Sequence, residues 1–261
     1  MKRYLSVIGL AAQSSFWKRL ALIVLSAALA GLLLYIAPES VPVHYVDENG
    51  EEQTYEDTIS PSELPSTGKV AAPLAIGFGG LCSILARTGG GKGAKTGYTM
   101  QRLRVKKRTA CLLWTAYDFM MLVLFWAVAA LTVLAVMSLR VKNYTGSEVG
   151  PQTLIFAFYE SSLLHHLLPM GDVLSWVGNV TMALACAVAC VNVAYAEWKG
   201  KMAGVPLGMA AMTMTSFRVS VAHSSYMFFY IVGEVIFTGI ILYSWLGGEE
   251  DGEKEPEAGH S

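Results

Sequence analysis

The sequence has few charged residues. Asp, Glu, Lys and Arg make up 15% of its 261 residues, whereas soluble globular chains average about 25%. Hydrophobic residues make up 54% of the chain, and the mean hydropathy is +0.45. The charges lie in the gaps between long, uncharged apolar blocks. This distribution excludes disordered and collagen-like chains and predicts an integral membrane protein.

Cysteine is also scarce, and its placement excludes a disulfide-stapled secreted protein. The four cysteines all lie in or beside apolar blocks: Cys82, Cys111, Cys186 and Cys190. The last two are spaced i, i+4 and therefore share one helical face. A metal centre or a redox pair needs further ligands and access to water. We therefore interpret the cysteines as small buried hydrophobic residues.

A nucleotide-binding loop is missing. The segment Gly89–Thr96 is rich in Gly and Lys, but Ala94 stands where a phosphate-binding loop requires its second Gly. The segment also follows an apolar span and not a soluble β-strand. Any ATP chemistry must therefore come from a partner chain. The sequence predicts no enzyme activity of its own, no cofactor and no nucleic-acid partner.

The charges are distributed asymmetrically between two loops. Residues 39–69 carry eight acids and one base, whereas residues 87–108 carry eight bases and no acid. Four more bases precede the first apolar block: Lys2, Arg3, Lys18 and Arg19. Because basic loops stay on the cytoplasmic side, the N-terminus and the basic loop 87–109 are predicted to be cytoplasmic. The acidic loop is predicted to lie outside, as expected for a multi-pass protein of the inner membrane.

The apolar blocks predict an all-α transmembrane domain that covers residues 1–246. Its six predicted spans are 20–36, 70–86, 110–139, 173–198, 203–217 and 226–246. A five-span alternative makes 203–222 a cytoplasmic re-entrant segment and places the tail outside. The acidic tail, 247–261, is predicted to be disordered.

Three segments outside the spans have their own predictions. Residues 1–19 have apolar side chains at helical spacing and predict an amphipathic helix in the inner interface, with a signal peptide as the competing interpretation. Residues 152–168 predict a surface or re-entrant helix on the outer side. In the acidic loop, alternating Val41, Val43 and Tyr45 before Asn49-Gly50 favour a small β-hairpin. A disordered loop is the alternative there.

Polar residues inside spans are candidates for function because they are costly in lipid. Four of the polar residues in the spans are singled out as candidates: Asp118, Asn179, Asn192 and Glu234. Glu234 lies near the middle of the last predicted span and is expected to face other helices. Asn179, Thr181 and Asn192 are its possible hydrogen-bond partners. Structural stabilisation and a transport or gating role are both open for this carboxylate.

Glu160, His165 and His166 in the predicted outer helix suggest a metal site at first. On one helix, however, successive residues turn by about 100°. The three side chains therefore point to three different faces and cannot converge on one ion. We interpret them as interfacial polar residues, and the sequence predicts no metal centre.

The basic loop contains a short predicted helix, 98–105. Met100 and Leu103 are three residues apart, with Arg102 and Arg104 around them. One interpretation is a topology determinant that binds anionic lipid. The other is a cationic helix, anchored by its apolar residues, that docks in the groove of a partner protein.

Four segments between residues 97 and 172 form a recognisable set. They are GYTMQRLRV at 97–105, WTAYD at 114–118, FAFYE at 156–160 and LLHHLLP at 163–169. In these segments, which cover less than a third of the chain, the sequence resembles a group of bacterial ABC-transporter permease subunits. Asp118 is a departure, because that group usually has Asn at the matching position.

The resemblance implies a six-span, exporter-like half-transporter with an interfacial N-terminal helix. It implies an ABC ATP-binding subunit as a separate partner, which holds the ATP, and a second permease copy or paralogue. The coupling helix would contact the ATPase through five residues of the basic loop: Tyr98, Met100, Arg102, Leu103 and Arg104. The expected function is substrate export driven by ATP hydrolysis on the partner. The alternative is a non-transporting membrane scaffold or assembly subunit.

Overall fold

The computed structural model describes residues 2–46, 52–87, 107–143, 151–198 and 224–247. Five long helices form its body: α1 (Lys2–Tyr35), α3 (Ala71–Arg87), α5 (Lys107–Asn143), α8 (Val173–Trp198) and α10 (Ser224–Gly247). Shorter elements complete it: β1 (Ser40–Val46), β2 (Glu52–Thr58), α2 (Leu64–Thr67), α6 (Pro151–Glu160) and α7 (Ser162–Leu167).

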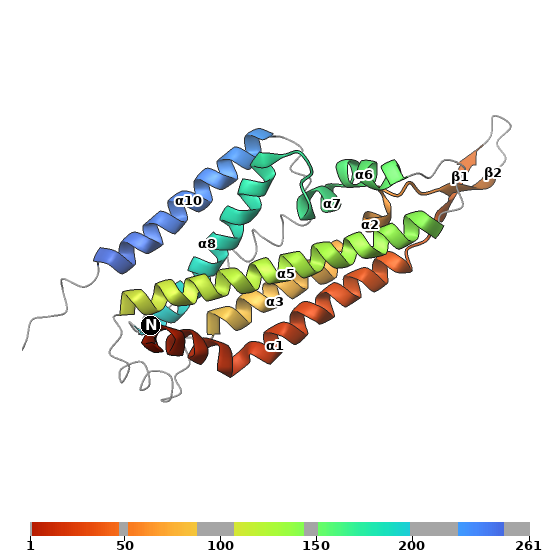
Figure 1. Ribbon diagram of the computed structural model, residues 1–261. Helices are drawn as coiled ribbons and strands as arrows, with labels where there is room; N and C mark the ends of the chain where they lie inside the picture. Colours follow the sequence, from red (N-terminus) through yellow and green to blue (C-terminus); the bar gives the residue numbers. More distant parts are fainter. Residues whose placement is uncertain (1, 47–51, 88–106, 144–150, 199–223, 248–261) are drawn as a thin grey trace, which may run out of the picture.

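Helices α1, α3, α5 and α8 form a four-helix bundle in which the chain direction alternates (Figure 1). Helix α1 packs against α3 and α5, and α8 packs against the same two helices. We call the end where α3 finishes and α5 begins the N-terminal end of the bundle, and the opposite end, near β1 and β2, the hairpin end (Figure 1). Small residues bring the helices close together. At Gly77, for example, an added Cβ would lie 2.4 Å from Cβ of Ser26 on α1.

Four helical segments are long and apolar enough to cross a membrane: Phe16–Tyr35, Arg108–Asn143, Val173–Ala196 and Met227–Trp245. Helix α3 is apolar but has 17 residues, a length of about 26 Å, which is close to the minimum for the hydrocarbon core. The prediction of a mostly helical membrane protein is thus confirmed. Of the six predicted spans, 203–217 lies outside the described residues, as does the acidic tail beyond Gly247.

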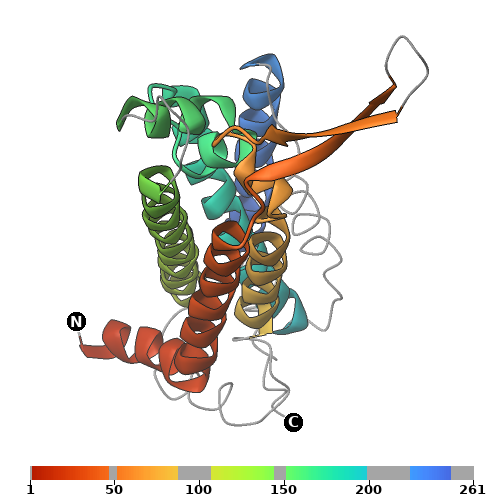
Figure 2. The ribbon, with the colours of Figure 1, turned by 90° about the vertical axis from the view of Figure 1, so that its right-hand side faces the viewer.

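The acidic loop forms a β-hairpin, one of the two structures expected there. Strands β1 and β2 pair antiparallel, with Val43 opposite Tyr55 and Ser40 opposite Thr58. The pairing continues into a hydrogen bond of 2.8 Å from Ile59 N to Glu39 O. The hairpin projects away from the helices (Figure 2). Within the part of the chain that the structure describes, this hairpin is the element that is not helical.

The N-terminal segment is helical, as expected, but it is not a separate element. Helix α1 is continuous over 34 residues and includes the first predicted span. Its first turns point away from the axis of the rest of the helix at the N-terminal end of the bundle (Figure 2). The placement of this segment in the membrane interface stays a prediction.

The predicted outer helix, 152–168, is two short helices, α6 and α7, that lie at the hairpin end (Figure 1). The break falls at Ser161, which has an extended backbone conformation. Its hydroxyl accepts a hydrogen bond of 3.5 Å from Leu164 N, so Ser161 caps α7. The sequence prediction missed this cap because the apolar residues continue on both sides of it. With 10 residues, α6 is too short to cross a membrane.

Helices α8 and α10 run parallel. Thr181 Oγ1 donates to Glu234 Oε2 over 2.7 Å, and Trp245 Nε1 donates to Asn192 Oδ1 over 3.2 Å. Both pairs are separated by 53 residues in the chain. A constant separation along two paired helices means that both run in the same direction. Consequently, α8 ends at the N-terminal end of the bundle, whereas α10 starts at the hairpin end (Figure 1).

Candidate functional site

A buried charged cluster joins α1 to α5 near the N-terminal end of the bundle. Arg19 has no exposed surface, and Asp118 is 3% exposed. The guanidinium carbon of Arg19 lies 5.0 Å from the centre of the Tyr117 ring, which is within the range of a cation–π contact. Arg19 also interacts electrostatically with Asp118. Arg19 therefore offsets part of the cost of burying the Asp118 carboxyl inside the helical bundle.

Arg19 was interpreted from the sequence as one of the bases that flank the first span. That interpretation missed its burial. Arg19 is among the first residues of the apolar segment Phe16–Tyr35, and Asp118 is ten residues into Arg108–Asn143. The sequence contains both residues but does not show that α1 and α5 are neighbours, so it could not identify the pair.

The bonds between α8 and α10 form a second polar site. The carboxylate of Glu234 points to α8 and accepts its hydrogen bond from Thr181, one of the three partners considered for it. Asn192 binds Trp245 instead. The residues of α10 that contact α8 lie four or seven positions apart: Met227, Glu234, Ile241 and Trp245. This is the spacing of a helix pair with a regular seam, and its two polar contacts fix the register.

At the hairpin end, several hydrogen bonds tie α7 to the start of α8. Asn179 Nδ2 donates to His166 O over 2.8 Å, and Trp176 Nε1 donates to Pro169 O over 2.6 Å. Asp172 caps α8, since its Oδ1 accepts from Leu174 N at 3.0 Å and from Ser175 N at 3.2 Å. The predicted intramembrane residue Asn179 therefore anchors the α7–α8 junction and does not contact Glu234.

The electrostatics of this junction are distinctive. The hydrogen bond from the Ser175 hydroxyl holds the pKa of Asp172 below its usual value. Burial, followed by the neighbouring His165, lowers the pKa of His166 from 6.5 to about 4. His166 is therefore neutral at physiological pH. His165 Nε2 lies 3.8 Å from Asp172 Oδ2, whereas Glu160 is exposed at the end of α6.

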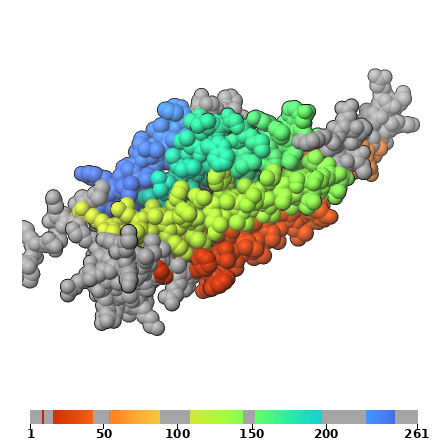
Figure 3. All heavy atoms as spheres, in the orientation of Figure 1, coloured from red at the N-terminus to blue at the C-terminus, as the bar shows by residue number. Residues whose placement is uncertain are grey.

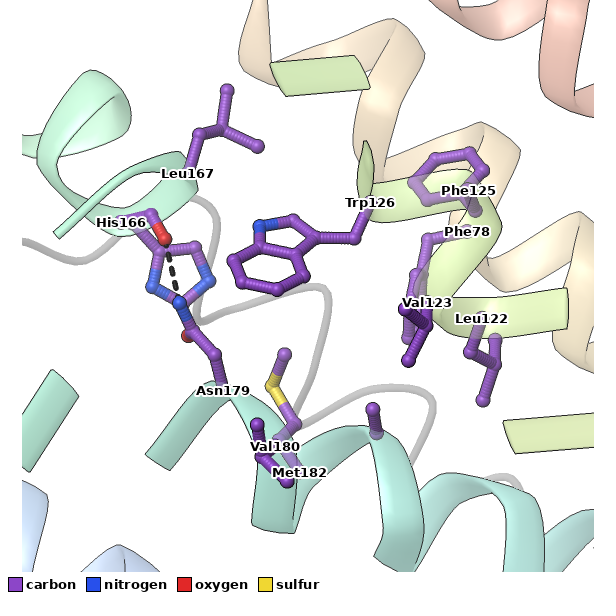
Figure 4. Close-up of a pocket in the computed structure, with 11 residues that line it drawn as sticks. Phe78, Leu122, Val123, Phe125, Trp126, His166, Leu167, Asn179, Val180 and Met182 are labelled. Carbon is purple, nitrogen blue, oxygen red and sulfur yellow. Dashed lines mark hydrogen bonds between the residues drawn. The ribbon is translucent and has the colours of Figure 1, made fainter. Parts of the chain in front are cut away.

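The same junction covers a small apolar cavity between α3, α5, α7 and α8 (Figure 4). Its volume is about 30 Å³, which is room for water but not for a drug-sized ligand. Residues that line it include Phe78, Phe125, Trp126, His166, Asn179 and Met182. Asn179 Oδ1 is buried and has no hydrogen-bond partner among the described residues. The cavity is therefore a packing defect with one polar atom in its wall.

Within the described ranges, no group of three His, Cys, Asp or Glu side chains is arranged to hold a metal ion. All four cysteines are buried free thiols. Cys82 on α3 meets α8, where Cys190 Sγ lies 3.5 Å from Cys82 O. These residues pack at a helix crossing, in agreement with their interpretation as small hydrophobic residues.

The predicted coupling residues Tyr98, Met100, Arg102, Leu103 and Arg104 lie outside the described residues, which resume at Lys107. Their role stays a prediction. Comparison of the chain with protein-family models, with curated proteins and with solved structures finds no match. The arguments that follow therefore depend on this chain's own residues.

Proposed function

We propose that this protein is the membrane-spanning permease subunit of an ABC transporter. A separate ATP-binding subunit would hydrolyse ATP, and this chain, with a second permease copy or paralogue, would form the export pathway. The proposal places the protein in the inner membrane with its N-terminus in the cytoplasm. The segments 97–105, 114–118, 156–160 and 163–169 resemble such permeases, and the arrangement of the helices supports the same function.

The observation that carries the proposal is the meeting of three features at one end of the bundle. Helix α3 ends there at Arg87, α5 begins there at Lys107, and the first turns of α1 lie there as well (Figure 1). The eight bases of residues 87–108 are thus held between two helix ends on the side predicted to be cytoplasmic. A soluble ATPase would find its docking loop on this side.

The buried cluster of Arg19, Tyr117 and Asp118 lies toward the same end of the bundle. It joins α1 to the first turns of α5. A partner that moves the start of α5 would therefore also move α1, because Arg19 of α1 packs over the ring of Tyr117 on α5 inside the bundle. This gives a physical route by which ATP hydrolysis outside the membrane would tilt the spans.

A six-span topology is part of the proposal. Because α8 and α10 are parallel, the chain has to return from the N-terminal end of the bundle to the hairpin end between Trp198 and Ser224. The uncharged residues 203–217 are the segment that would make this crossing. The parallel pairing of α8 and α10 supports six spans over the five-span alternative, in which the two helices would run antiparallel.

The test is affinity purification of the full chain in mild detergent, with identification of the chains that co-purify and measurement of ATPase activity. The proposal expects a nucleotide-binding ABC subunit in the complex. Leu103→Asp should release that subunit, because buried apolar contacts dominate such interfaces. Lys106→Gln should have a smaller effect that is largest at low salt, because high salt already screens the attraction of the lysine. Repeated purification without any ATPase would instead favour the scaffold function.

A further inference from the structure

The carboxyl group of Glu234 lies deep in a candidate membrane span. Along the helix, Glu234 is about 10 Å from the start of Met227–Trp245 and about 16 Å from its end. Its side chain is half-buried, whereas Tyr230, one turn before it, and Ile236 are exposed. An added Cβ at Gly233 would meet no atom within 4 Å. Among the described residues, one side of this carboxyl group is therefore open.

No charged side chain accompanies Glu234 on the helix against which α10 mainly packs. That helix is α8, and its segment Val173–Ala196 contains no Asp, Glu, Lys, Arg or His. The titratable residues of the segment point elsewhere. Cys186 and Cys190 belong to the cluster at the crossing with α3, and Tyr195 packs near the ring of Trp245.

The bases nearest to α10 lie at its far end. The start of α5 packs against α10 at Trp245, where Cys111 is its titratable contact residue. Lys107 and Arg108 belong to the same end of α5. Trp245 is about 16 Å along the helix from Glu234. Within the described part of the chain, the hydrogen bond to Thr181 is the polar contact of Glu234.

The hydrogen bonds of Thr181 indicate where a proton is held. Thr181 Oγ1 lies 2.7 Å from Glu234 Oε2 and 3.0 Å from Gly178 O. A hydroxyl group has one hydrogen to donate, and a carbonyl oxygen can only accept. When the carboxyl group is ionised, the hydroxyl can therefore serve only one of these two acceptors. Both contacts are hydrogen bonds at the same time when the carboxyl group donates a proton of its own to Thr181 Oγ1.

We propose that Glu234 and Thr181 form a proton-binding site between α10 and α8. Glu234 holds the proton and donates it to Thr181 Oγ1, while the Thr181 hydroxyl donates to Gly178 O. A neutral carboxylic acid suits this position, because an ionised side chain at this depth is costly without a counter-charge. Loss of the proton would not break the contact, since the hydroxyl can turn from Gly178 O to Glu234 Oε2. The site goes beyond the permease function and does not depend on it.

Labelling with a lipid-soluble carbodiimide in membrane vesicles tests the proposal. Dicyclohexylcarbodiimide takes the proton of a carboxylic acid on one nitrogen, and a carboxyl oxygen bonds to its central carbon. The acyl group then moves to nitrogen and gives a stable N-acylurea without any leaving group. The peptide that contains Glu234 should gain the mass of one reagent molecule at pH 7. The same peptide of Glu234→Gln should gain none.

A water-soluble carbodiimide provides the comparison. It should label Glu160, which is exposed at the end of α6, and leave Glu234 unlabelled. Two results would overturn the proposal: no reaction of Glu234 with the lipid-soluble reagent, or reaction with the water-soluble reagent alone. The second result would mean that this carboxyl group is in contact with water and not with lipid.

Infrared spectroscopy tests the hydrogen bond itself. The difference spectrum between the native chain and Glu234→Gln should contain the C=O stretching band of a protonated carboxyl group. Thr181→Val removes the acceptor of the proton and should shift this band, whereas Thr181→Ser keeps a hydroxyl group and should leave it in place. Bands of an ionised carboxylate, or a band that Thr181→Val does not move, would contradict the proposal. Neither measurement involves the ATPase, so a failure here is separate from a failure of the permease function.

Discussion

Helices α8 and α10 run side by side in the same direction, have 26 and 24 residues, and are both strongly apolar. Yet α8 is the most buried of the candidate spans and α10 the least. Helix α8 contacts α3, α5 and α10, whereas the principal neighbour of α10 is α8 (Figure 3 shows their surfaces side by side). Hydrophobicity therefore does not decide which of two membrane helices becomes the interior one.

Residue size explains the difference. The buried stretch of α8 consists of Ala, Cys and Val at positions 185–191, whereas the exposed side chains of α10 are large, as at Phe229, Ile236 and Tyr243. Lipid chains are as apolar as Leu or Phe, so large apolar residues gain nothing by leaving lipid, while small residues allow helices to approach closely. A helix of small apolar residues is thus the one that other helices surround.

The largest expected effect on stability comes from changing Arg19, the buried arginine beside Asp118. Helix α10 contains no arginine that could accompany its own carboxylate, Glu234. Arg19→Leu should destabilise the protein by about 3 kcal/mol, because the buried polar side chain of Asp118 loses the cation that compensates it. The double variant Arg19→Leu/Asp118→Leu should recover much of this loss. The measurement is the free energy of unfolding in detergent, with the exposed neighbour Lys18→Leu as the control. If Arg19→Leu behaves like Lys18→Leu, the cluster does not stabilise the fold.

The next effect compares glycines in the two regions. Gly77→Ala should cost about 1–3 kcal/mol by overpacking, because the new Cβ would meet Cβ of Ser26 on the rigid backbone of α1. Gly233→Ala on α10 should be neutral or slightly stabilising, since space is available there and Ala favours helix formation. The unfolding temperatures of the two variants, each measured against the native chain, test this difference. Equal losses would mean that another chain segment occupies the space beside Gly233.

A smaller effect concerns the attachment of α10 itself. Glu234→Leu removes the hydrogen bond from Thr181 and should cost about 0.6–2 kcal/mol, whereas Glu234→Gln retains an acceptor and should cost less. Hydrogen exchange of the α10 amides in detergent should increase for Glu234→Leu while that of α8 stays unchanged. Val235→Leu, at an exposed position, is the control. If the Glu234→Leu variant keeps full transport activity, the carboxylate has only a structural role.

The five long helices could be predicted because each contains an uncharged run that is long enough to be conspicuous without any knowledge of packing. The hairpin could be predicted as an alternative, because alternation and Asn49-Gly50 are local signals. The burial of Arg19 and the parallel pairing of α8 with α10 could not. Both depend on which helices are neighbours, and this information is not contained in the periodicity of any one segment. The division into α6 and α7 depends on one cap, at Ser161, inside an apolar run.

The smallest expected effect concerns how firmly the two helices are anchored at their starts. Helix α8 begins with the junction that includes His166, whose pKa of about 4 lies below the ordinary value of 6.5. As the pH falls below 6.5, the unfolded chain binds a proton before the folded protein does, so stability is complete above this pH and decreases as the pH falls toward 4. The loss can be at most about 1.4 kcal/mol for each pH unit, and we expect about half of that or less because the ring is not fully buried.

Unfolding temperatures measured at pH 7 and at pH 5.5 test this effect. The native chain should be less stable at the lower pH, and His166→Gln should reduce the difference, because Gln does not titrate. His165→Gln is the matched control, since its ring is half-buried and lies beside the carboxylate of Asp172. Hydrogen exchange should locate the loosening at the start of α8 and leave the seam between α8 and α10 unaffected. If α10 loosens first on acidification, His166 is not the group that responds to pH in this range.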